Sequence, residues 1–191
     1  MSLESAVEAV RSGEVVGMPT DTVYGIGVDP LNEDAVARLF ELKGRPEGKP
    51  VGVLVANIHQ ALELAEIEGP AHELALRFWP GALTLVVRPR VIMADWVGDA
   101  QRRTIGIRVP DHTVALDLLR SVGPMAVTSA NLSGQPDALD DREARMVFGS
   151  RVAAYLEGVS PGGEGSTVVD ATGAHLVVLR QGPVSIAGGL S

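Results

Sequence analysis

The stretch VGVLVA at residues 51–56 is an unbroken apolar run of strand length, and LTLVV at 83–87 is a second one. Neither run alternates between apolar and polar residues, as a strand with one face in water would. Such runs are typical of a sheet that helices cover on both faces. Both are far shorter than the roughly 20 residues that a membrane-spanning helix needs.

Helical periodicity alternates with further strand-like runs along the chain. A first helix is predicted after Ser2, because apolar residues at 3, 6, 7 and 10 recur at helical spacing before Gly13. No linker rich in Pro, Gly or Ser divides the chain, and no period repeats. We therefore predict that residues 1–191 form one α/β domain around an open, twisted, mixed sheet with helices on both faces. Five further helices are predicted: one from a cap at Asn32 to Gly44, one from Asn57, one from Pro70, one from a cap at Asp111 to Leu119, and one from near Asp140. The other predicted strands are 14–19, 104–109, 124–129, 166–170 and 175–180.

Composition restricts the class of protein. The chain has 191 residues, with 16 basic and 24 acidic side chains, so its formal charge is 16 − 24 = −8. It contains no cysteine, which excludes disulfides, thiolate metal sites and a cysteine nucleophile. The opening MSLESAVEAV carries acids where a secretory leader would be basic. We expect a soluble, cytoplasmic protein with no membrane association.

The charge is unevenly distributed. Residues 1–76 carry 5 − 13 = −8, residues 77–108 carry 6 − 2 = +4, and residues 109–191 carry 5 − 9 = −4. A basic segment within an acidic chain suggests a local anionic ligand, such as a phosphate or a carboxylate, more than general binding of nucleic acid. The alternative is that these arginines are scattered over the surface.

Several common active-site patterns are missing from the sequence. The histidines at 59, 72, 112 and 175 form no i, i+4 pair and no carboxylate ladder accompanies them, so no metal-binding cage is expected. There is no G-x-S-x-G elbow, no G-x-x-x-x-G-K-[ST] loop and no G-x-G-x-x-G after a strand. A bound nucleotide would have to be held in another way.

Two polar clusters in the first half of the chain follow predicted strands or helices. PTDTVYGIG at 19–27 offers the hydroxyls of Thr20 and Thr22 and glycines that allow a ligand close to the backbone; alternatively it is a turn with a core tyrosine at Tyr24. KGRPEGKP at 43–50 gathers three basic residues at a helix exit, a set suited to a triphosphate. The helix dipole accounts for one of those three charges, but not for all of them.

Two more clusters lie in the second half. TIGIRVPDH at 104–112 places Arg108 near the end of an apolar strand, where it needs an anion or carbonyl groups, unless it is exposed on the face opposite Ile105 and Ile107. TSANLSG at 128–134 concentrates short donors and acceptors at a strand end, although its serines could equally cap a helix.

Taken in order, PTDTVYGIG, KGRP, FWPGALTLV, TIGIRVPDH, TSANLSG and STVVD resemble the YrdC family of threonylcarbamoyl-AMP synthases, and the chain looks like the short, single-domain form. The resemblance implies an open α/β fold with a large basic cavity on one side of a twisted sheet. It also implies a nucleotidyltransferase that converts L-threonine, bicarbonate and ATP into threonylcarbamoyl-adenylate and pyrophosphate. That product serves the threonylcarbamoyladenosine modification of tRNA next to the anticodon, through partner threonylcarbamoyl transferase proteins.

The resemblance also assigns roles to residues. It implies Lys43 and Arg45 as catalytic residues, and Mg²⁺ carried by the ATP and not by a protein cage. Longer relatives have a histidine where this chain has Leu54, so no threonine contact is transferred to that position. The implied threonine site comprises Thr22, Arg108, Thr128 and Ser166, and the implied nucleotide site comprises Arg45, Lys49, Thr104, Ser129, Asn131 and Arg180.

Two other functions stay open from the sequence. A module that binds double-stranded RNA or the ribosome could use the same basic concavity, although the overall negative charge weakens attraction to a polyanion. A relative that adenylates a different carbamate would share the chemistry but not the amino acid. No protein nucleophile is needed in either adenylation, which would depend on positioning and charge neutralisation.

Overall fold

The computed structural model describes residues 2–44, 50–94 and 96–186. None of the helices in those ranges is long and apolar enough to cross a membrane. The helices are α1 (Leu3–Arg11), α2 (Glu33–Lys43), α3 (Ile58–Leu64), α4 (Gly69–Phe78), α5 (Thr113–Val122), α6 (Asp141–Phe148) and the 3-10 turn η1 (Gly149–Arg151). The strands are β1 (Val16–Met18), β2 (Gly25–Val28), β3 (Gly52–Leu54), β4 (Ala65–Glu66), β5 (Leu83–Pro89), β6 (Ile105–Arg108), β7 (Met125–Ser129), β8 (Ala154–Tyr155), β9 (Thr167–Asp170) and β10 (Val177–Arg180).

Side-chain caps start most of the helices where the sequence predicted them. The side chains of Ser2, Asn32 and Asn57 each accept a hydrogen bond from the amide three residues later. Asp140 caps α6 in the same way. The predicted cap at Asp111 is wrong: α5 begins one residue later, because the extended backbone of His112 supplies the first carbonyl acceptor, and its side chain makes no capping bond.

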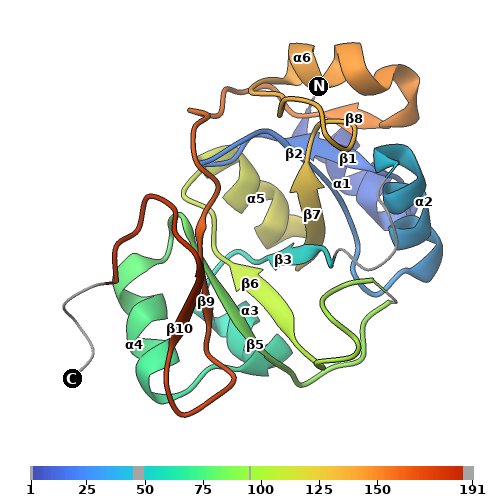
Figure 1. Ribbon diagram of the computed structural model, residues 1–191. Coiled ribbons are helices and arrows are strands. Elements are labelled where there is room, and N and C mark those ends of the chain that lie inside the picture. Colours follow the sequence, from blue (N-terminus) through green and yellow to red (C-terminus); the bar gives the residue numbers. More distant parts are fainter. Residues whose placement is uncertain (1, 45–49, 95, 187–191) are drawn as a thin grey trace.

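The ten strands of the described residues belong to one mixed sheet. Nine of them follow the order β10-β9-β5-β6-β3-β7-β2-β1-β8, and β4 pairs with β5. The pairs β1–β8, β3–β6 and β5–β9 are parallel, and the other pairs are antiparallel. The α/β fold and the mixed, open sheet are therefore confirmed (Figure 1).

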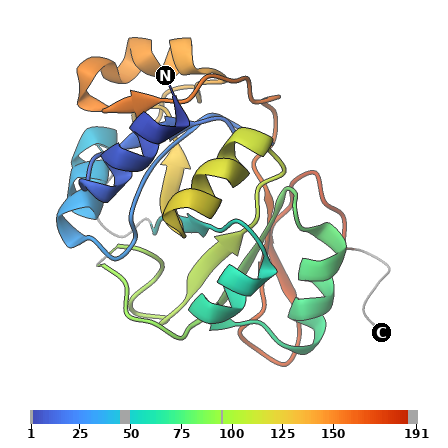
Figure 2. The same cartoon turned by 180° about the vertical axis from the view of Figure 1, so that it is seen from behind.

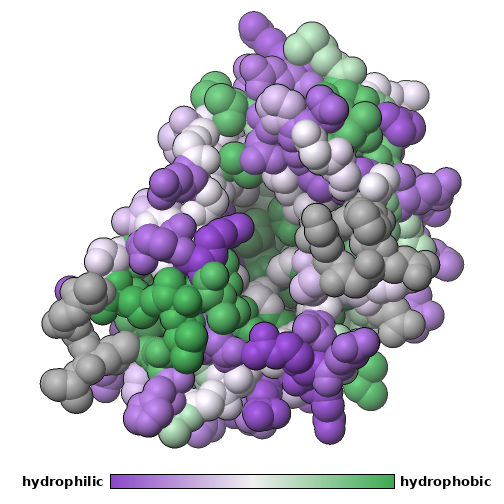
Figure 3. Space-filling view, in the orientation of Figure 1, coloured by the Kyte–Doolittle hydropathy of each residue, from purple (hydrophilic) through white to green (hydrophobic). Residues whose placement is uncertain are grey.

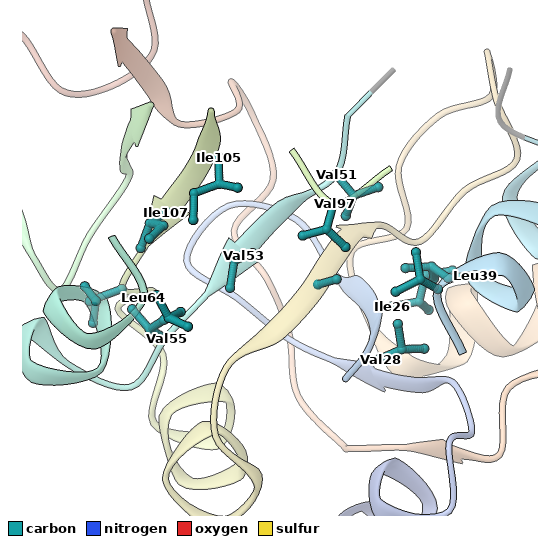
Figure 4. Packing of buried hydrophobic residues seen from close by; sticks show 14 of the residues in the cluster. Ile26, Val28, Leu39, Val51, Val53, Val55, Leu64, Val97, Ile105 and Ile107 are labelled. Carbon is teal, nitrogen blue, oxygen red and sulfur yellow. The ribbon is translucent and has the colours of Figure 1, made fainter. Parts of the chain in front are cut away.

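Helices cover the two faces of the sheet unequally. At the β1–β2 end, Val16 and Met18 pack in one apolar cluster with α1 and α5, while Ile26 and Val28 belong to a second cluster with α2 (Figure 4). At the β3–β5–β6 end, the same second cluster joins the sheet to α3 and α4, which lie over it when the molecule is seen from behind (Figure 2). Within the described residues, no helix covers the opposite face of β5, β6 and β3 (Figure 1). The described helices thus lie on both faces near β1 and β2 alone, and the face of β3, β5 and β6 that they leave bare is where a site can form.

Strand β2 begins inside PTDTVYGIG, where the sequence predicted a turn, and ends one residue after it. Its glycines are required by packing: a Cβ at Gly25 would lie 2.8 Å from Val127, and one at Gly27 would lie 2.7 Å from the same side chain. Because glycine has low strand propensity, this strand has no apolar signature in the sequence. The two-residue strands β4 and β8 are too short to leave one.

Candidate functional site

A cavity of about 520 Å³ opens on the bare face of the sheet. In the space-filling view it is a hollow in the middle of the molecule, with hydrophobic residues in its depth and both hydrophilic residues and a hydrophobic patch beside it (Figure 3). Its walls come from the loop before β2, from β3, β5, β6 and β7, and from β9 and β10.

Most residues that the sequence predicted for a site converge on this cavity, although they are spread over more than 150 positions of the chain. Lys43 and Asn131 are not among its lining residues but lie behind its wall, and the predictions for Arg45 and Lys49 fall outside the described residues. The predicted residues that line the cavity are Thr22, Thr104, Arg108, Thr128, Ser129, Ser166 and Arg180.

Arg108 is the charged group at the base of the cavity, and it is only 6% exposed. One terminal nitrogen of its guanidinium donates to Asp21 at 2.9 Å, and the other donates to the hydroxyl of Thr22 at 3.1 Å. Its Nε has no hydrogen-bond partner among the described residues. Burial lowers the pKa of Arg108, Asp21 opposes that shift, and the positive charge of Arg180 adds to it. The alternative interpretation, that Arg108 is exposed on this strand, is thereby excluded.

Ser166 and Arg180 form a second group on the β9–β10 side. The Oγ of Ser166 lies 2.7 Å from the hydroxyl of Thr84. Arg180 donates to the carbonyl of Ser166 through its Nε at 3.0 Å and through a terminal nitrogen at 2.8 Å. These bonds fix the guanidinium of Arg180 beside Ser166, so the late segment that carries both residues is part of the cavity wall.

Lys43 connects the end of α2 to the TSANLSG loop. It is 4% exposed, and its ammonium donates to the carbonyl of Ser129 at 2.6 Å, to the hydroxyl of Ser129 at 3.0 Å and to the side-chain oxygen of Asn131. The hydroxyl of Ser129 also donates to Asn131 at 2.8 Å. In this arrangement Lys43 supports the residue that lines the cavity and does not itself face it.

Sequence reasoning did not single out three polar residues of the site. Asp21 lies within the motif PTDTVYGIG, but nothing in the sequence indicates that it pairs with Arg108. Thr84 and Arg102 had no signal beyond their place in a strand and in the basic segment. Tyr24, by contrast, is fully buried and donates to the carbonyl of Leu156 at 2.7 Å, and burial raises its pKa. The alternative that Tyr24 is a residue of the hydrophobic core is therefore confirmed.

The charges along the cavity are mixed. Arg102, Arg108 and Arg180 line it together with Asp99 and Asp137, so its net positive character stays a prediction. Within the described ranges no three His, Asp or Glu side chains converge into a metal-binding group. Leu54 contributes an apolar part of the wall.

The sequence matches known proteins over nearly its whole length. A family model named Sua5_yciO_yrdC, with the description "Telomere recombination", matches residues 8–182. A relative from Mycobacterium tuberculosis, provisionally named a threonylcarbamoyl-AMP synthase, is 51% identical over 95% of this chain and 84% of its own length. The threonylcarbamoyl-AMP synthase of Vibrio cholerae is 38% identical over 95% of this chain and 97% of its own length.

Solved structures share the fold. The crystal structure of Pyrococcus abyssi Sua5 complexed with L-threonine superposes with a TM-score of 0.86 and 37% identity over 93% of this chain. The E. coli YciO structure gives a TM-score of 0.87 at 27% identity, over 97% of this chain and 91% of YciO. The chain spans about half of the length of Sua5, 53%.

Proposed function

The chain belongs to the Sua5/YciO/YrdC family, and from this membership we propose that it is a threonylcarbamoyl-AMP synthase. The enzyme would join L-threonine, bicarbonate and ATP into L-threonylcarbamoyl-adenylate and release pyrophosphate, which is a nucleotidyl transfer. One observation carries the proposal: an arginine that is almost completely buried lies at the base of an open cavity among hydroxyl groups. Such an arrangement suits a small amino acid with a carboxylate and a hydroxyl.

The threonine end of the site is assigned to the surroundings of Arg108. A guanidinium can bind a carboxylate through charge-assisted hydrogen bonds, and burial strengthens them. Thr22, Thr128 and Ser166 place short polar groups in the same cavity, suited to the amine and the hydroxyl of threonine. The solved structure of Sua5 with L-threonine supports this amino acid as the substrate.

The nucleotide end is assigned to the opposite part of the cavity. Thr104 and Ser129 line it, with Asn131 behind Ser129. We assign Arg180, which is bonded to Ser166, to the junction between the threonine site and the nucleotide. Lys43 is the last residue of α2 and acts on the nucleotide end through Ser129 and Asn131. Arg45 and Lys49 follow it in the sequence, and we assign their charges to the triphosphate. Mg²⁺ would enter with ATP, held by phosphate oxygens and water, and would help to neutralise the phosphates.

The reaction needs no nucleophile from the protein. The amine of threonine condenses with bicarbonate to a carbamate: a carbon–nitrogen bond forms, a carbon–oxygen bond of bicarbonate breaks, and water leaves. One carbamate oxygen then attacks the α-phosphorus of ATP. A new phosphorus–oxygen bond forms, while the bond to the β-phosphate bridging oxygen breaks and pyrophosphate leaves. The protein contributes positioning and charge neutralisation, the dominant effects in such transfers. We further propose that the enzyme works in the cytoplasm and that tRNA-modifying transferase proteins receive its product.

Synthesis in vitro tests this function. The purified protein is incubated with ATP, Mg²⁺, bicarbonate and labelled L-threonine, and the labelled adenylate and pyrophosphate are quantified together. We expect both products in equal amounts, and neither when bicarbonate is removed. Pyrophosphate release with another amine in place of threonine, and none with threonine, would instead identify a relative that adenylates a different carbamate.

A further inference from the structure

Two glycines lie side by side in the centre of the cavity floor. Gly52 is in β3 and Gly106 is in β6, and the parallel pairing of Val53 with Ile107 places the two glycines next to each other. Neither has a positive φ, so the backbone conformation does not require glycine at either position. Central strand positions normally favour β-branched or aromatic residues, and a glycine there weakens the strand.

Packing within the protein does not require these two glycines either. A Cβ built at Gly106 would have its nearest contact at 3.2 Å, with the methyl group of Thr84, and one at Gly52 would lie 3.3 Å from the carbonyl of Gly106. Both contacts are tight but lie above the 3.0 Å below which neighbouring atoms must be displaced: the Thr84 side chain can adjust to a Cβ at Gly106, whereas a Cβ at Gly52 needs a shift of a few tenths of an ångström in the neighbouring strand. By comparison, a Cβ at Gly17 would lie 2.8 Å from Tyr24, as close as those at the glycines of β2 come to Val127. The β1 and β2 glycines therefore serve packing, whereas the pair in the cavity floor does not.

The missing side chains leave a bare strip of backbone between two valines. The register places Val86 beside Gly106 and Val127 beside Gly52, so the row across the sheet is Val86, Gly106, Gly52 and Val127. Three strand spacings separate the valines, a width of about 14 Å. All four residues line the cavity. The strip is thus a flat, apolar floor with an apolar side chain at each end.

The position of this floor indicates which part of a ligand it faces. Along β6, Arg108 follows Gly106 on the same face, and Thr104 precedes it. The floor therefore lies between the charged end assigned to threonine and the end assigned to the nucleotide. Threonine would be held by hydroxyl and guanidinium groups, for which a bare apolar floor has no use. A purine ring is flat, apolar on its faces and wide enough to span two strands.

We propose that Gly52 and Gly106 are specificity-determining residues whose bare backbone forms the floor on which the adenine and ribose of ATP lie. This inference rests on the proposed function for the identity of the nucleotide. A side chain at either position would project into the space that the base occupies, while the protein itself would tolerate it. In this inference the two glycines leave room for the ligand, although glycine makes β3 and β6 less stable.

The variants Gly52→Ala and Gly106→Ala test this inference by direct binding. Isothermal titration calorimetry is performed with the non-reacting analogue α,β-methylene-ATP and separately with L-threonine. We expect each variant to bind the nucleotide about 10-fold more weakly or worse, as overpacking predicts, with threonine affinity within about 3-fold. The melting temperature should change little, because the lower entropy of the unfolded chain with alanine offsets the tight contacts of the new Cβ. Gly173→Ala, in an open loop position, is the matched control and should change neither affinity.

A second variant separates the ligand from Thr84. In Gly106→Ala/Thr84→Ser the methyl group near the new Cβ is gone, while the hydroxyl that bonds Ser166 remains. Nucleotide affinity should stay low in this double variant. Recovery of affinity would show that the alanine acts through Thr84 and would overturn the inference, as would unchanged nucleotide binding in both single variants or a loss confined to threonine.

The test is independent of the proposed reaction. A wild-type protein that binds the analogue over this floor but makes no adenylate would refute the synthase and leave the floor in place. A wild-type protein that synthesises the adenylate while both alanine variants bind the analogue normally would refute the floor alone.

Discussion

Arg108 combines near-complete burial with a full positive charge, and one carboxylate balances it. The side chain of Arg108 is 7% exposed and that of Asp21 is 13% exposed, and a terminal guanidinium nitrogen lies 2.9 Å from a carboxylate oxygen. An unbalanced charge at such depth is costly, and removing one partner of a buried pair destabilises a protein strongly. Asp21 therefore both stabilises the fold and holds Arg108 in the orientation in which it faces the cavity.

Replacing the buried acid tests this role. In Asp21→Asn the charge is lost while the shape is kept, so we expect the free energy of unfolding to fall by about 2 kcal/mol. The Michaelis constant for L-threonine should rise more than that for ATP, because Arg108 loses its orientation. Chemical denaturation and steady-state kinetics measure the two effects.

Asp117→Asn is the matched control for that substitution. Asp117 pairs with Arg120 at 2.7 Å, but both side chains are about half exposed, 46% and 55%. Exposed pairs contribute at most about 1 kcal/mol, so stability and both Michaelis constants should change little. Equal effects of the two substitutions would contradict the special role of Asp21.

At the scale of elements, Lys43 ties the last turn of α2 to the end of β7. Lysine suits this place, since a compact ammonium can donate to three separate oxygens, whereas the planar fork of arginine cannot converge on them. This connection holds Ser129 in the cavity wall.

Removing the ammonium should loosen that wall. In Lys43→Met, buried oxygens of Ser129 and Asn131 lose a donor, so we expect a loss of about 2 kcal/mol in unfolding free energy and a raised Michaelis constant for ATP. Lys43→Arg should restore neither. Arg38→Met on the same helix, where the arginine is half exposed, serves as control. Full nucleotide affinity in Lys43→Met would show that Ser129 needs no such support.

A second tie joins β9 to the turn before β6. Asp170 accepts from Arg102 at 2.6 Å and from the hydroxyl of Thr172 at 2.6 Å. Burial alone would raise the pKa of Asp170, but the hydrogen bonds from Thr172 and Arg102 outweigh it, and the net pKa is lowered. The charged carboxylate therefore contributes stability above about pH 4, and that contribution is lost as the pH falls through its folded pKa.

Thermal melts over a series of acidic pH values check this effect. Asp170→Asn should show a lower melting temperature than the wild type at neutral pH, with a difference that shrinks toward pH 3. A difference independent of pH would mean that the ionised form of Asp170 contributes no stability.

Some elements could be predicted from local sequence patterns, whereas others depend on contacts between residues far apart in the chain. The helices after Ser2, Asn32 and Asn57 were predictable because cap and periodicity are local properties. Strand β2 could not be predicted, because its glycines are required by packing against Val127, a residue about 100 positions away. The pairing of Asp21 with Arg108 spans 87 positions, and no local pattern records it. Seven of the site residues that the family resemblance assigned nevertheless line one cavity, although they are far apart in the sequence.

At the scale of the whole molecule, charge separates the synthase from an RNA-binding module. The chain carries −8 overall, and the described lining of the cavity mixes three arginines with two aspartates. Binding to a polyanion requires many phosphate contacts, each of which steepens the dependence of affinity on salt. A site for one nucleotide uses only a few charges, and these can act at short range inside a net acidic protein.

Salt titration distinguishes the two functions. We expect no binding of a 20-base-pair RNA duplex at about 150 mM salt, and only a shallow dependence of the ATP Michaelis constant on salt, with a slope of about −1 to −3 for log affinity against log salt. A fluorescence anisotropy assay with labelled duplex and the synthesis assay provide the two measurements. Submicromolar affinity for the duplex, with a slope steeper than about −5, would mean that six or more phosphates are neutralised. In that case a basic surface outside the cavity dominates the behaviour of the molecule, and the charge argument for a small-ligand enzyme is wrong.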